Sequence, residues 1–512
     1  QAERERADTR GIRREVAVVW HEGAVLREGC ARGLRVPQRV GDQPELAQHR
    51  WVERIALGGL LEDLFGGVEL PGTGERPAVE PLGFAGGRQR GGGAFQGFER
   101  VRQGVDPVAM FVGHLQPDAA KRGVLVSRST EGVYDAPGTI ATRAGRHDVR
   151  AWTSLDGRAF YRFGEGYRAE GQRPFLDRCT FDGTPSTRLF ESEATRLEAP
   201  VTLLSADGRR FLTLGQSATE TPNWFLRRSG ESSAMAVSAF TNPAEALSKA
   251  QRQSFTFKRD DGVVLNAEVV LPADWKKGDA PLPTVFWIYP NDYRSAAAAS
   301  QNRTSPNRFP SQSALNPEVL VTQGYAVVKP DLAIVGTNDQ YVAELQRSAQ
   351  AAVDECVRRG FTDRDRIAVG GHSYGAFSTV NCLAHTKLFR AGLASDGAYN
   401  RTLTPFTFQA ETRNLWEARD TYLGMSPFLY ANQIDAPLLL VHNQDDTNVG
   451  TNPIQSQRLY EALNGLGKTV QLVEYPYEDH GPVARETVLD YWARALEWFD
   501  RYVKHATPPQ AP

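Results

Sequence analysis

The sequence predicts two kinds of fold in one chain: an α/β part with a doubly wound sheet at the C-terminal end, and a smaller all-β part before it. Three observations support this prediction. Apolar strand-like runs alternate with helix-like segments from about residue 251 onward. Residues 366–377 lead from an apolar strand through Gly-x-Ser-x-Gly into a helical pattern. Residues 127–250 contain short strand-like pieces between turn clusters.

The first 126 residues have an unusual composition. They are rich in arginine and glycine, contain the single lysine Lys121, and have no serine, asparagine or tyrosine. Ordinary globular domains do not avoid three common turn and surface residues together. We interpret the segment as non-native sequence, a GC-rich reading frame translated in the wrong frame or strand. A disordered Arg/Gly-rich segment is the alternative, and with either interpretation we expect no function from it.

Residues 127–250 have the pattern of an all-β region. Strand-like pieces lie at 158–163, 188–191, 201–204 and 210–213, and Ser-Ala-Asp-Gly at 205–208 is typical of a β-turn. This spacing suits the blades of a β-propeller. The segment is long enough for only the last one or two blades, so we expect a partial propeller rather than a closed ring.

Residues 251–507 have the pattern of an α/β domain, followed by a short tail at 508–512. The alternation in 254–271 indicates two strands joined at Asp260-Asp261-Gly262, and 339–359 has the apolar spacing of a helix packed on a sheet. The other expected elements are, in order, strands 284–289 and 326–330, strand 366–372 with the helix after it, strands 391–394 and 437–442, helix 453–466, strand 470–475 and helix 491–503.

The Gly-x-Ser-x-Gly turn puts Ser373 where a serine hydrolase of the α/β-hydrolase fold has its nucleophile. Such a serine sits on a strained turn, and side chains at 371 and 375 would collide where strand and helix pass close together. The turn also directs helix N-terminal N–H groups at the space above Ser373, so we expect the N–H of Tyr374 to stabilise an oxyanion. A chance occurrence of the short motif is the alternative, which the context disfavours.

Two strand ends further along carry an acid and a base in the order Ser, Asp, His that this fold uses. Asp445 or Asp446 follows the strand 437–442, and His480 follows the strand 470–475. In open α/β sheets such groups collect at the carboxyl ends of the strands, so the three loops can converge. A turn-forming aspartate and a surface histidine are the separate alternatives, but their joint placement predicts a catalytic triad.

Other residues of reactive types are expected to be structural. His372 lies beside the serine and His442 ends a buried strand, so both are expected to pack or to form hydrogen bonds. Four widely spaced cysteines form no disulfide-rich pattern, and Cys356 and Cys382 lie in helix-like runs where burial is expected. No metal constellation, phosphate loop or dinucleotide fingerprint is present in the sequence, so we expect no cofactor and no metal.

Charge and hydropathy exclude several partner classes. The 59 basic and 61 acidic residues are balanced and form no basic stripe, so no nucleic acid is expected as a partner. No apolar run approaches the roughly 20 residues that a membrane-spanning helix needs. We therefore expect a soluble protein of the cytoplasm or periplasm, and the choice stays open because a signal peptide could be missing upstream. The oligomeric state is also open.

Three long stretches carry a resemblance to a known family. They are Gly-Gly-His-Ser-Tyr-Gly-Ala-Phe at 370–377, Gly-Ala-Tyr-Asn-Arg-Thr-Leu-Thr-Pro-Phe at 397–406, and Glu-Asp-His-Gly-Pro-Val-Ala-Arg-Glu at 478–486. Over roughly its last 380 residues the chain resembles the prolyl oligopeptidase family of serine peptidases, most of all its glutamyl endopeptidase branch. The middle stretch is specific to that branch. In this family a propeller covers the active site.

The resemblance implies further residue roles. The family carboxylate lies four residues after a strand-ending histidine; here that histidine is His442, which selects Asp446, although Asn443 stands where glycine is usual. The second oxyanion donor of the family is a tyrosine hydroxyl, and Tyr289 matches its position; the alternative is a tyrosine that caps a buried strand. Cleavage after glutamate is implied as well, and it needs a cationic partner. Arg401 is the first candidate and Arg413 the second, the alternative being a structural ion pair.

The predicted function is serine peptidase chemistry on a peptide or an unfolded polypeptide. Ser373 would attack the carbonyl, His480 would relay the proton, and Asp446 would hold the imidazole tautomer. A carboxylesterase is an alternative, because the same triad hydrolyses esters on this fold. A truncated, inactive pseudo-hydrolase that binds without turnover is the non-enzyme alternative.

Overall fold

The computed structural model describes residues 96–101, 108–114, 123–144, 149–181 and 185–506. Most of the segment 1–126, which the sequence predicts to be non-native, lies outside the described residues, as does the tail 508–512. Cys30 also lies outside them.

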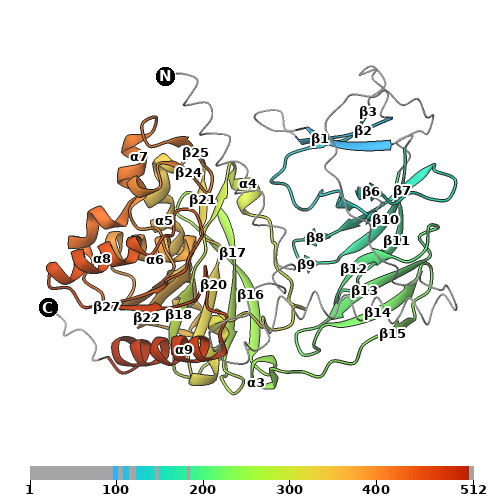
Figure 1. Ribbon diagram of the computed structural model, residues 1–512. Coiled ribbons are helices and arrows are strands. Elements are labelled where there is room, and N and C mark those ends of the chain that lie inside the picture. The colour runs from blue at the N-terminus through green and yellow to red at the C-terminus, as the bar shows by residue number, and fades with distance from the viewer. Residues whose placement is uncertain (1–95, 102–107, 115–122, 145–148, 182–184, 507–512) are drawn as a thin grey trace, which may run out of the picture. The chain divides into compact units, whose positions relative to one another are not determined.

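An eight-stranded sheet organises the C-terminal half of the chain (Figure 1). The first three strands in spatial order pair antiparallel with one another, and every later pair of neighbouring strands is parallel. In spatial order the strands are β16 (Gln251–Lys258), β17 (Val264–Leu271), β20 (Ala326–Pro330), β18 (Leu282–Trp287), β22 (Thr362–His372), β23 (Ala391–Ser395), β26 (Leu438–Asn443) and β27 (Val470–Tyr475).

Helices cover both faces of this sheet (Figure 1). One apolar core joins the sheet to α5, α6 and α8, and a second joins it to α9 and η2. Because both faces are buried, the central strands read as nearly continuous apolar runs. The helices are α3 (Glu245–Ser248), α4 (Ala296–Ala299), α5 (Tyr341–Arg359), α6 (Tyr374–His385), α7 (Arg419–Gly424), α8 (Ile454–Gly465) and α9 (Arg485–Phe499). Short helical turns are η2 (Pro317–Gln323), η3 (Asn338–Gln340), η4 (Arg401–Leu403), η5 (Pro427–Gln433) and the π-turn η6 (Asp500–Lys504).

Helix α5 illustrates how the sequence forms this layer. Its buried positions, which include Leu345, Ala349, Ala352 and Cys356, recur at helical spacing and form the stripe that packs on the sheet. The helix ends at Gly360, whose φ of +87° is the left-handed conformation that glycine adopts without strain. Two small strand pairs complete the domain, β19 (Asn291–Tyr293) with β21 (Ala333–Val335) and β24 (Phe406–Phe408) with β25 (Glu411–Asn414).

The preceding region consists of antiparallel strands. Two four-stranded sheets have the orders β11-β10-β7-β4 and β12-β13-β14-β15, and four strands make one propeller blade. The strands are β4 (Thr139–Ile140), β7 (Ala159–Gly164), β10 (Phe175–Thr180), β11 (Thr187–Glu191), β12 (Leu197–Leu203), β13 (Arg210–Gln216), β14 (Asn223–Arg228) and β15 (Ala234–Ala236). Smaller sheets comprise β1 (Gln96–Val101), β2 (Val108–His114) and β3 (Gly123–Arg128), β5 (Thr142–Ala144) with β6 (Val149–Ala151), and β8 (Tyr167–Arg168) with β9 (Gly171–Gln172).

These observations confirm the predicted fold class, an α/β-hydrolase sheet preceded by part of a propeller. Cys356 and Cys382 are buried in α5 and α6, as predicted. Among the described helices, none combines the length and the apolar character needed to cross a membrane.

Candidate active site

The turn from β22 into α6 places Ser373 in a strained conformation. Its φ of +58° and ψ of −117° are unusual for a residue with a side chain. The flanking glycines make the turn possible. A Cβ on Gly371 would lie 2.6 Å from the carbonyl oxygen of Ile288, and one on Gly375 only 2.1 Å from that same oxygen. The chain therefore passes this point only with glycine at both positions, and Ser373 is presented at the tip.

His480 joins Ser373 to Asp446. Its Nδ1 lies 2.9 Å from Oδ2 of Asp446, and its Nε2 lies 2.9 Å from Oγ of Ser373. An ionised carboxylate only accepts, so the proton of the neutral ring resides on Nδ1 and Nε2 is left to accept from the serine hydroxyl. This tautomer is the one a general base needs.

Asp446 is the aspartate that the geometry selects from the two candidates. It is buried, whereas Asp445 is exposed and only its backbone N–H is engaged, with the carbonyl of Glu478. Burial alone would raise the pKa of Asp446, but hydrogen bonds from His442, His480 and the N–H of Asn448 outweigh it and hold the pKa well below its usual range. The carboxylate is thus charged in the resting protein.

The environment of His480 favours its protonated form. Burial opposes protonation, yet the hydrogen bond and charge of Asp446 outweigh that effect and raise the pKa of His480, with smaller contributions from Asp396 and Asp479. The loop itself is fixed on both sides of His480. Glu478 accepts from the N–H groups of residues 483 and 484, and Asp479 accepts from the N–H and hydroxyl of Thr447.

Two groups can act on an oxyanion at Ser373. The N–H of Tyr374 is the first of helix α6, where N–H groups have no partner within the helix. Tyr289 comes two residues after β18 and is half exposed, with its ring edge-to-face on Tyr374 at a centroid distance of 5.8 Å. A Cβ on Gly375 would lie 3.6 Å from the Tyr289 ring, which puts the ring directly beside the turn.

Arg401 is completely buried and its guanidinium has no hydrogen-bond partner on any of its three nitrogens. The ring of Phe408 covers one face of the guanidinium, 3.4 Å from its carbon, and Phe408 in turn contacts Tyr374. Burial lowers the pKa of Arg401 to about 9, against the favourable influence of Tyr422 and other nearby groups. The site thus contains a cation whose in-plane N–H edges are unpaired.

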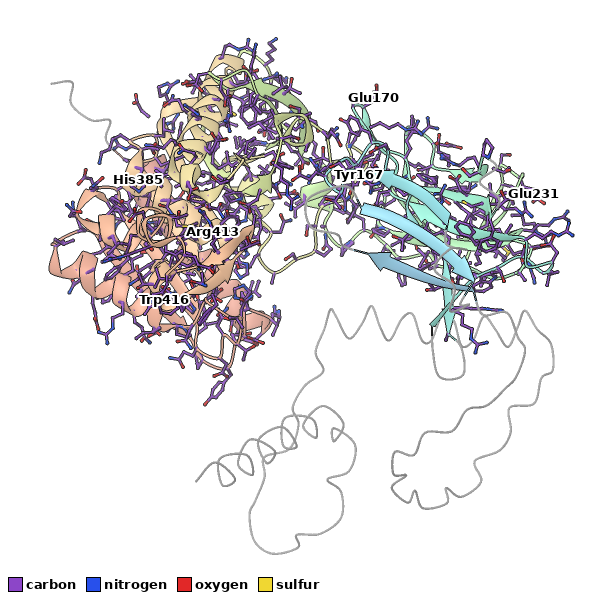
Figure 2. The ribbon with its side chains drawn as sticks, turned by 90° about the horizontal axis from the view of Figure 1, so that it is seen from above. Tyr167, Glu170, Glu231, His385, Arg413 and Trp416 are labelled. Atoms are coloured by element: carbon purple, nitrogen blue, oxygen red, sulfur yellow. The ribbon has the colours of Figure 1, made fainter. Side chains whose placement is uncertain are left out.

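Arg413, the second candidate, is committed elsewhere. It lies on β25 (Figure 2), and its guanidinium donates to Glu411 at 2.8 and 2.9 Å and to Asp339 at 2.9 Å. These hydrogen bonds and charges raise its pKa further above the ordinary range. An incoming anion would have to displace two acids to bind Arg413, whereas the nitrogens of Arg401 have no acid to displace.

Comparisons with known proteins agree with this geometry. Residues 310–506, which include the Gly-x-Ser-x-Gly turn (the elbow), Asp446 and His480, match the profile of the prolyl oligopeptidase family. The chain contains a prolyl oligopeptidase family domain. The family resemblance drawn from the motifs is therefore confirmed.

Relatives of this domain extend the similarity over most of the chain. A probable chloroplastic glutamyl endopeptidase of Oryza sativa subsp. japonica is 39% identical over 400 residues, covering 74% of this chain and 43% of the relative. The Arabidopsis thaliana protein of the same description is 38% identical, covering 74% and 42%. The chain thus spans about two fifths of the length of these relatives. Dipeptidyl peptidase 4 of Porphyromonas gingivalis shares the fold, with a TM-score of 0.57 and 17% identity over 77% of this chain and 54% of that one.

Within the described part of the prolyl oligopeptidase family domain, one group of side chains has metal-ligand spacing. Asp396, His442 and Asp446 each offer a ligand atom, and these atoms lie within 4.8 Å of one another. Both nitrogens of His442 are already engaged, with Ser456 Oγ and the carbonyl of Thr451 at 2.6 Å each, and Asp446 binds His480. We assign no metal to this group, because an ion would have to break these bonds.

Sequence reasoning missed two acids of the site. Asp396 follows β23 and is fully buried next to His372, which the sequence marked as a packing or hydrogen-bonding residue. Asp292 lies on β19 and accepts a hydrogen bond of 3.3 Å from the hydroxyl of Tyr374. Asp396 ends a strand on the same sheet edge as the triad, so its position was a usable signal. Asp292 gave no such signal.

Proposed function

We propose that this protein is a serine peptidase that acts through an acyl-enzyme. The observation that supports it best is the bridge of two 2.9 Å contacts that His480 makes between Ser373 and Asp446. Ser373 Oγ attacks the peptide carbonyl while His480 Nε2 takes the hydroxyl proton, and the same proton then passes to the leaving amine. A water molecule, deprotonated by His480, releases the acyl group. Asp446 holds the ring and offsets the charge of the imidazolium.

The oxyanion of the tetrahedral intermediate is assigned to two donors. The N–H of Tyr374 points from the helix terminus, where the helix dipole adds favourable potential. The hydroxyl of Tyr289 is the second donor; its exposure leaves it available to a substrate at the turn. Removal of one such donor from other serine proteases costs about 10²–10³ in kcat.

The proposed substrate is a peptide or an unfolded polypeptide with glutamate before the cleaved bond. Arg401 carries this assignment, because a buried guanidinium with three unpaired nitrogens lacks only a carboxylate partner. A glutamate side chain is planar at its end and can accept two parallel N–H bonds from the guanidinium edge. The description of the two plant relatives as probable glutamyl endopeptidases is consistent with this assignment.

A labelling experiment tests the chemistry before any substrate is known. We expect a fluorophosphonate probe to label the wild-type chain on Ser373, and Ser373→Ala to abolish both labelling and hydrolysis. An unlabelled wild-type protein that is folded would contradict the proposal and favour an inactive hydrolase. Peptides with one internal glutamate and short-chain esters are then compared as substrates. Turnover of esters with none of peptides would favour a carboxylesterase instead.

A further inference from the structure

A second histidine–carboxylate pair lies against the proposed catalytic one. The ring of His372 packs on the ring of His480 with a centroid distance of 4.6 Å and an interplanar angle of 49°. Nε2 of His372 lies 3.5 Å from Oδ2 of Asp396. That nitrogen is buried and has no hydrogen-bond partner among the described residues, so the carboxylate of Asp396 faces it without a formed hydrogen bond.

Asp396 is held rigidly as a buried acceptor. It has a φ of +53°, which is unfavourable for a residue with a side chain, and it is fully buried. The backbone N–H of Asn443 donates to Oδ1 at 2.8 Å, and the Asn443 amide and the Ser395 hydroxyl donate to Oδ2 at 3.2 and 2.9 Å. Three donors therefore fix the position of this carboxylate.

Some contacts of Asp396 hold the fold together, and others are not needed for folding. The bonds to Asn443 join the ends of β23 and β26, which any acceptor at 396 could do. They do not require a histidine at 372 stacked on His480, nor a carboxylate that faces that stack. The triad chemistry described above uses neither residue.

We propose that His372 and Asp396 are positioning residues for His480: the stacked ring fixes its orientation, and the buried carboxylate stabilises the imidazolium that forms when Ser373 loses its proton. This inference rests on the proposed serine hydrolase chemistry. His372 supplies a flat surface beside the His480 ring, which limits its rotation away from Ser373. Asp396 supplies a fixed negative charge in a region of low dielectric, where charge acts over several ångströms.

The charged and titratable groups around His480 determine which control variant the test needs. Asp446 binds it directly, His442 lies behind Asp446, His372 and Asp396 lie on the stacked side, and Asp479 precedes it in the chain. Asp396 and Asp479 both favour protonated His480, but Asp396 is buried and Asp479 is exposed. Solvent and salt screen the exposed charge more strongly. Asp479→Asn is therefore a matched control for Asp396→Asn.

The experiment measures the rate of fluorophosphonate labelling against pH, which needs no knowledge of the peptide substrate. Asp396→Asn should move the midpoint of the acid limb to lower pH by about half a unit, because protonated His480 loses a stabilising charge. Asp479→Asn should move it by less than half as much. His372→Ala should lower the plateau rate about tenfold through loss of ring orientation, and His372→Phe, which keeps a ring, should restore most of it.

Each residue role is contradicted by a different result. An acid midpoint in Asp396→Asn that matches the Asp479→Asn control would overturn the role of Asp396, and an unchanged plateau in His372→Ala would overturn that of His372. Thermal melting reports whether each variant folds. If Asp396→Asn does not fold, the two His372 variants, which both keep Asp396, decide the proposal. Failure of wild-type labelling would instead contradict the proposed function.

Discussion

Two buried charged groups of the candidate site differ in their partners, because the carboxylate of Asp446 is hydrogen-bonded and the guanidinium of Arg401 is not. Around the triad, Asp446 accepts from His480 and from the N–H of Asn448, and the imidazole connects it to Ser373. Around Arg401, the guanidinium is equally inaccessible but has an aromatic ring on one face and no acceptor at its nitrogens. The polar groups of the first region are hydrogen-bonded to one another, and the guanidinium of the second has no hydrogen-bond partner among the described residues.

Under the proposed function, the difference corresponds to two tasks: the triad performs the chemistry and Arg401 selects the substrate. A triad with its bonds already formed needs no reorganisation when charge develops, which is the condition for electrostatic catalysis. A buried cation without a partner costs stability, on the order of several kcal/mol even after the surrounding structure relaxes. If Arg401 binds the substrate carboxylate as proposed, that ligand recovers the cost, and Arg401 would reject neutral side chains more strongly than a paired arginine.

We expect the largest effect from a substitution in the triad. Asp446→Asn should lower kcat about 10⁴-fold, because an amide at this position favours the wrong tautomer of His480. Asp445→Asn changes an exposed residue that does not contact the ring, and it should retain nearly full activity. Steady-state kinetics of both variants on one peptide provide the measurement. Equal losses would leave the carboxylate unassigned, and a greater loss for Asp445→Asn would reverse our choice.

A smaller but more specific effect is expected from a substitution of Arg401. Arg401→Gln should lower kcat/KM for glutamate peptides by about 10²-fold or more, because the substrate carboxylate loses its charged partner. Matched glutamine peptides should change little. Arg413→Gln is the control, since its guanidinium already serves Glu411 and Asp339. A full preference for glutamate over glutamine in Arg401→Gln would assign the role to another residue.

Substitutions of the same two arginines should change the free energy of unfolding in opposite directions. Arg401→Met replaces an unpaired buried cation with an apolar chain of similar length and should stabilise the free protein by about 1–3 kcal/mol. Arg413→Met removes the cation that pairs with exposed Asp339 and with the buried carboxylate of Glu411, and it should destabilise the protein by about 1–3 kcal/mol. Denaturant unfolding of the two variants measures both values. A strongly destabilised Arg401→Met protein would show that the guanidinium has a structural partner.

The sequence predicted most of this architecture because strand runs and helical spacing report burial. The strand at 326–330 coincides with β20, and the strand at 470–475 with β27. Helix α9 begins six residues before the predicted position of 491, because its buried residues start at Tyr491 and the first turns are not buried in the core. In the all-β region, β10 and β14 were missed. Charged residues interrupt the apolar pattern of β10, and β14 has three consecutive apolar residues followed by two arginines instead of an alternation.

The sequence likewise predicted some features of the candidate site and not others. Ser373 and His480 follow strands whose ends must meet, so pattern and chain order were sufficient to bring them together. The same pattern left Asp445 and Asp446 open, and the family resemblance supplied the choice of Asp446. The contact between His372 and His480 depends on ring orientation, and the unpaired state of Arg401 depends on every neighbour it fails to contact. Neither property is encoded in a local pattern. Tertiary packing alone creates them.

Asp292 provides the smallest test, at the residue that lies between the two regions. Its carboxyl receives a hydrogen bond from Tyr374, whose N–H belongs to the elbow and whose ring packs on Phe408. Burial raises the pKa of Asp292 to about 6, and the hydrogen bond from Tyr374 only partly opposes it. A pKa raised on folding stabilises the protein below the unfolded value of 3.8, and this contribution is lost as pH rises through about 6.

We therefore expect Asp292→Asn to be more stable than wild type by about 1–2 kcal/mol at pH 7.5 and by little or nothing near pH 4. The amide cannot ionise, so it avoids the cost of a buried charge that neither a cation nor a second donor offsets. Thermal melting at the two pH values gives the difference, and Asp445→Asn, which changes an exposed carboxylate, is the control. A stability gain that is equal at both pH values would mean that Asp292 does not change its charge in this range, and its environment would then resemble the paired carboxylate of Asp446 rather than the unpaired guanidinium of Arg401.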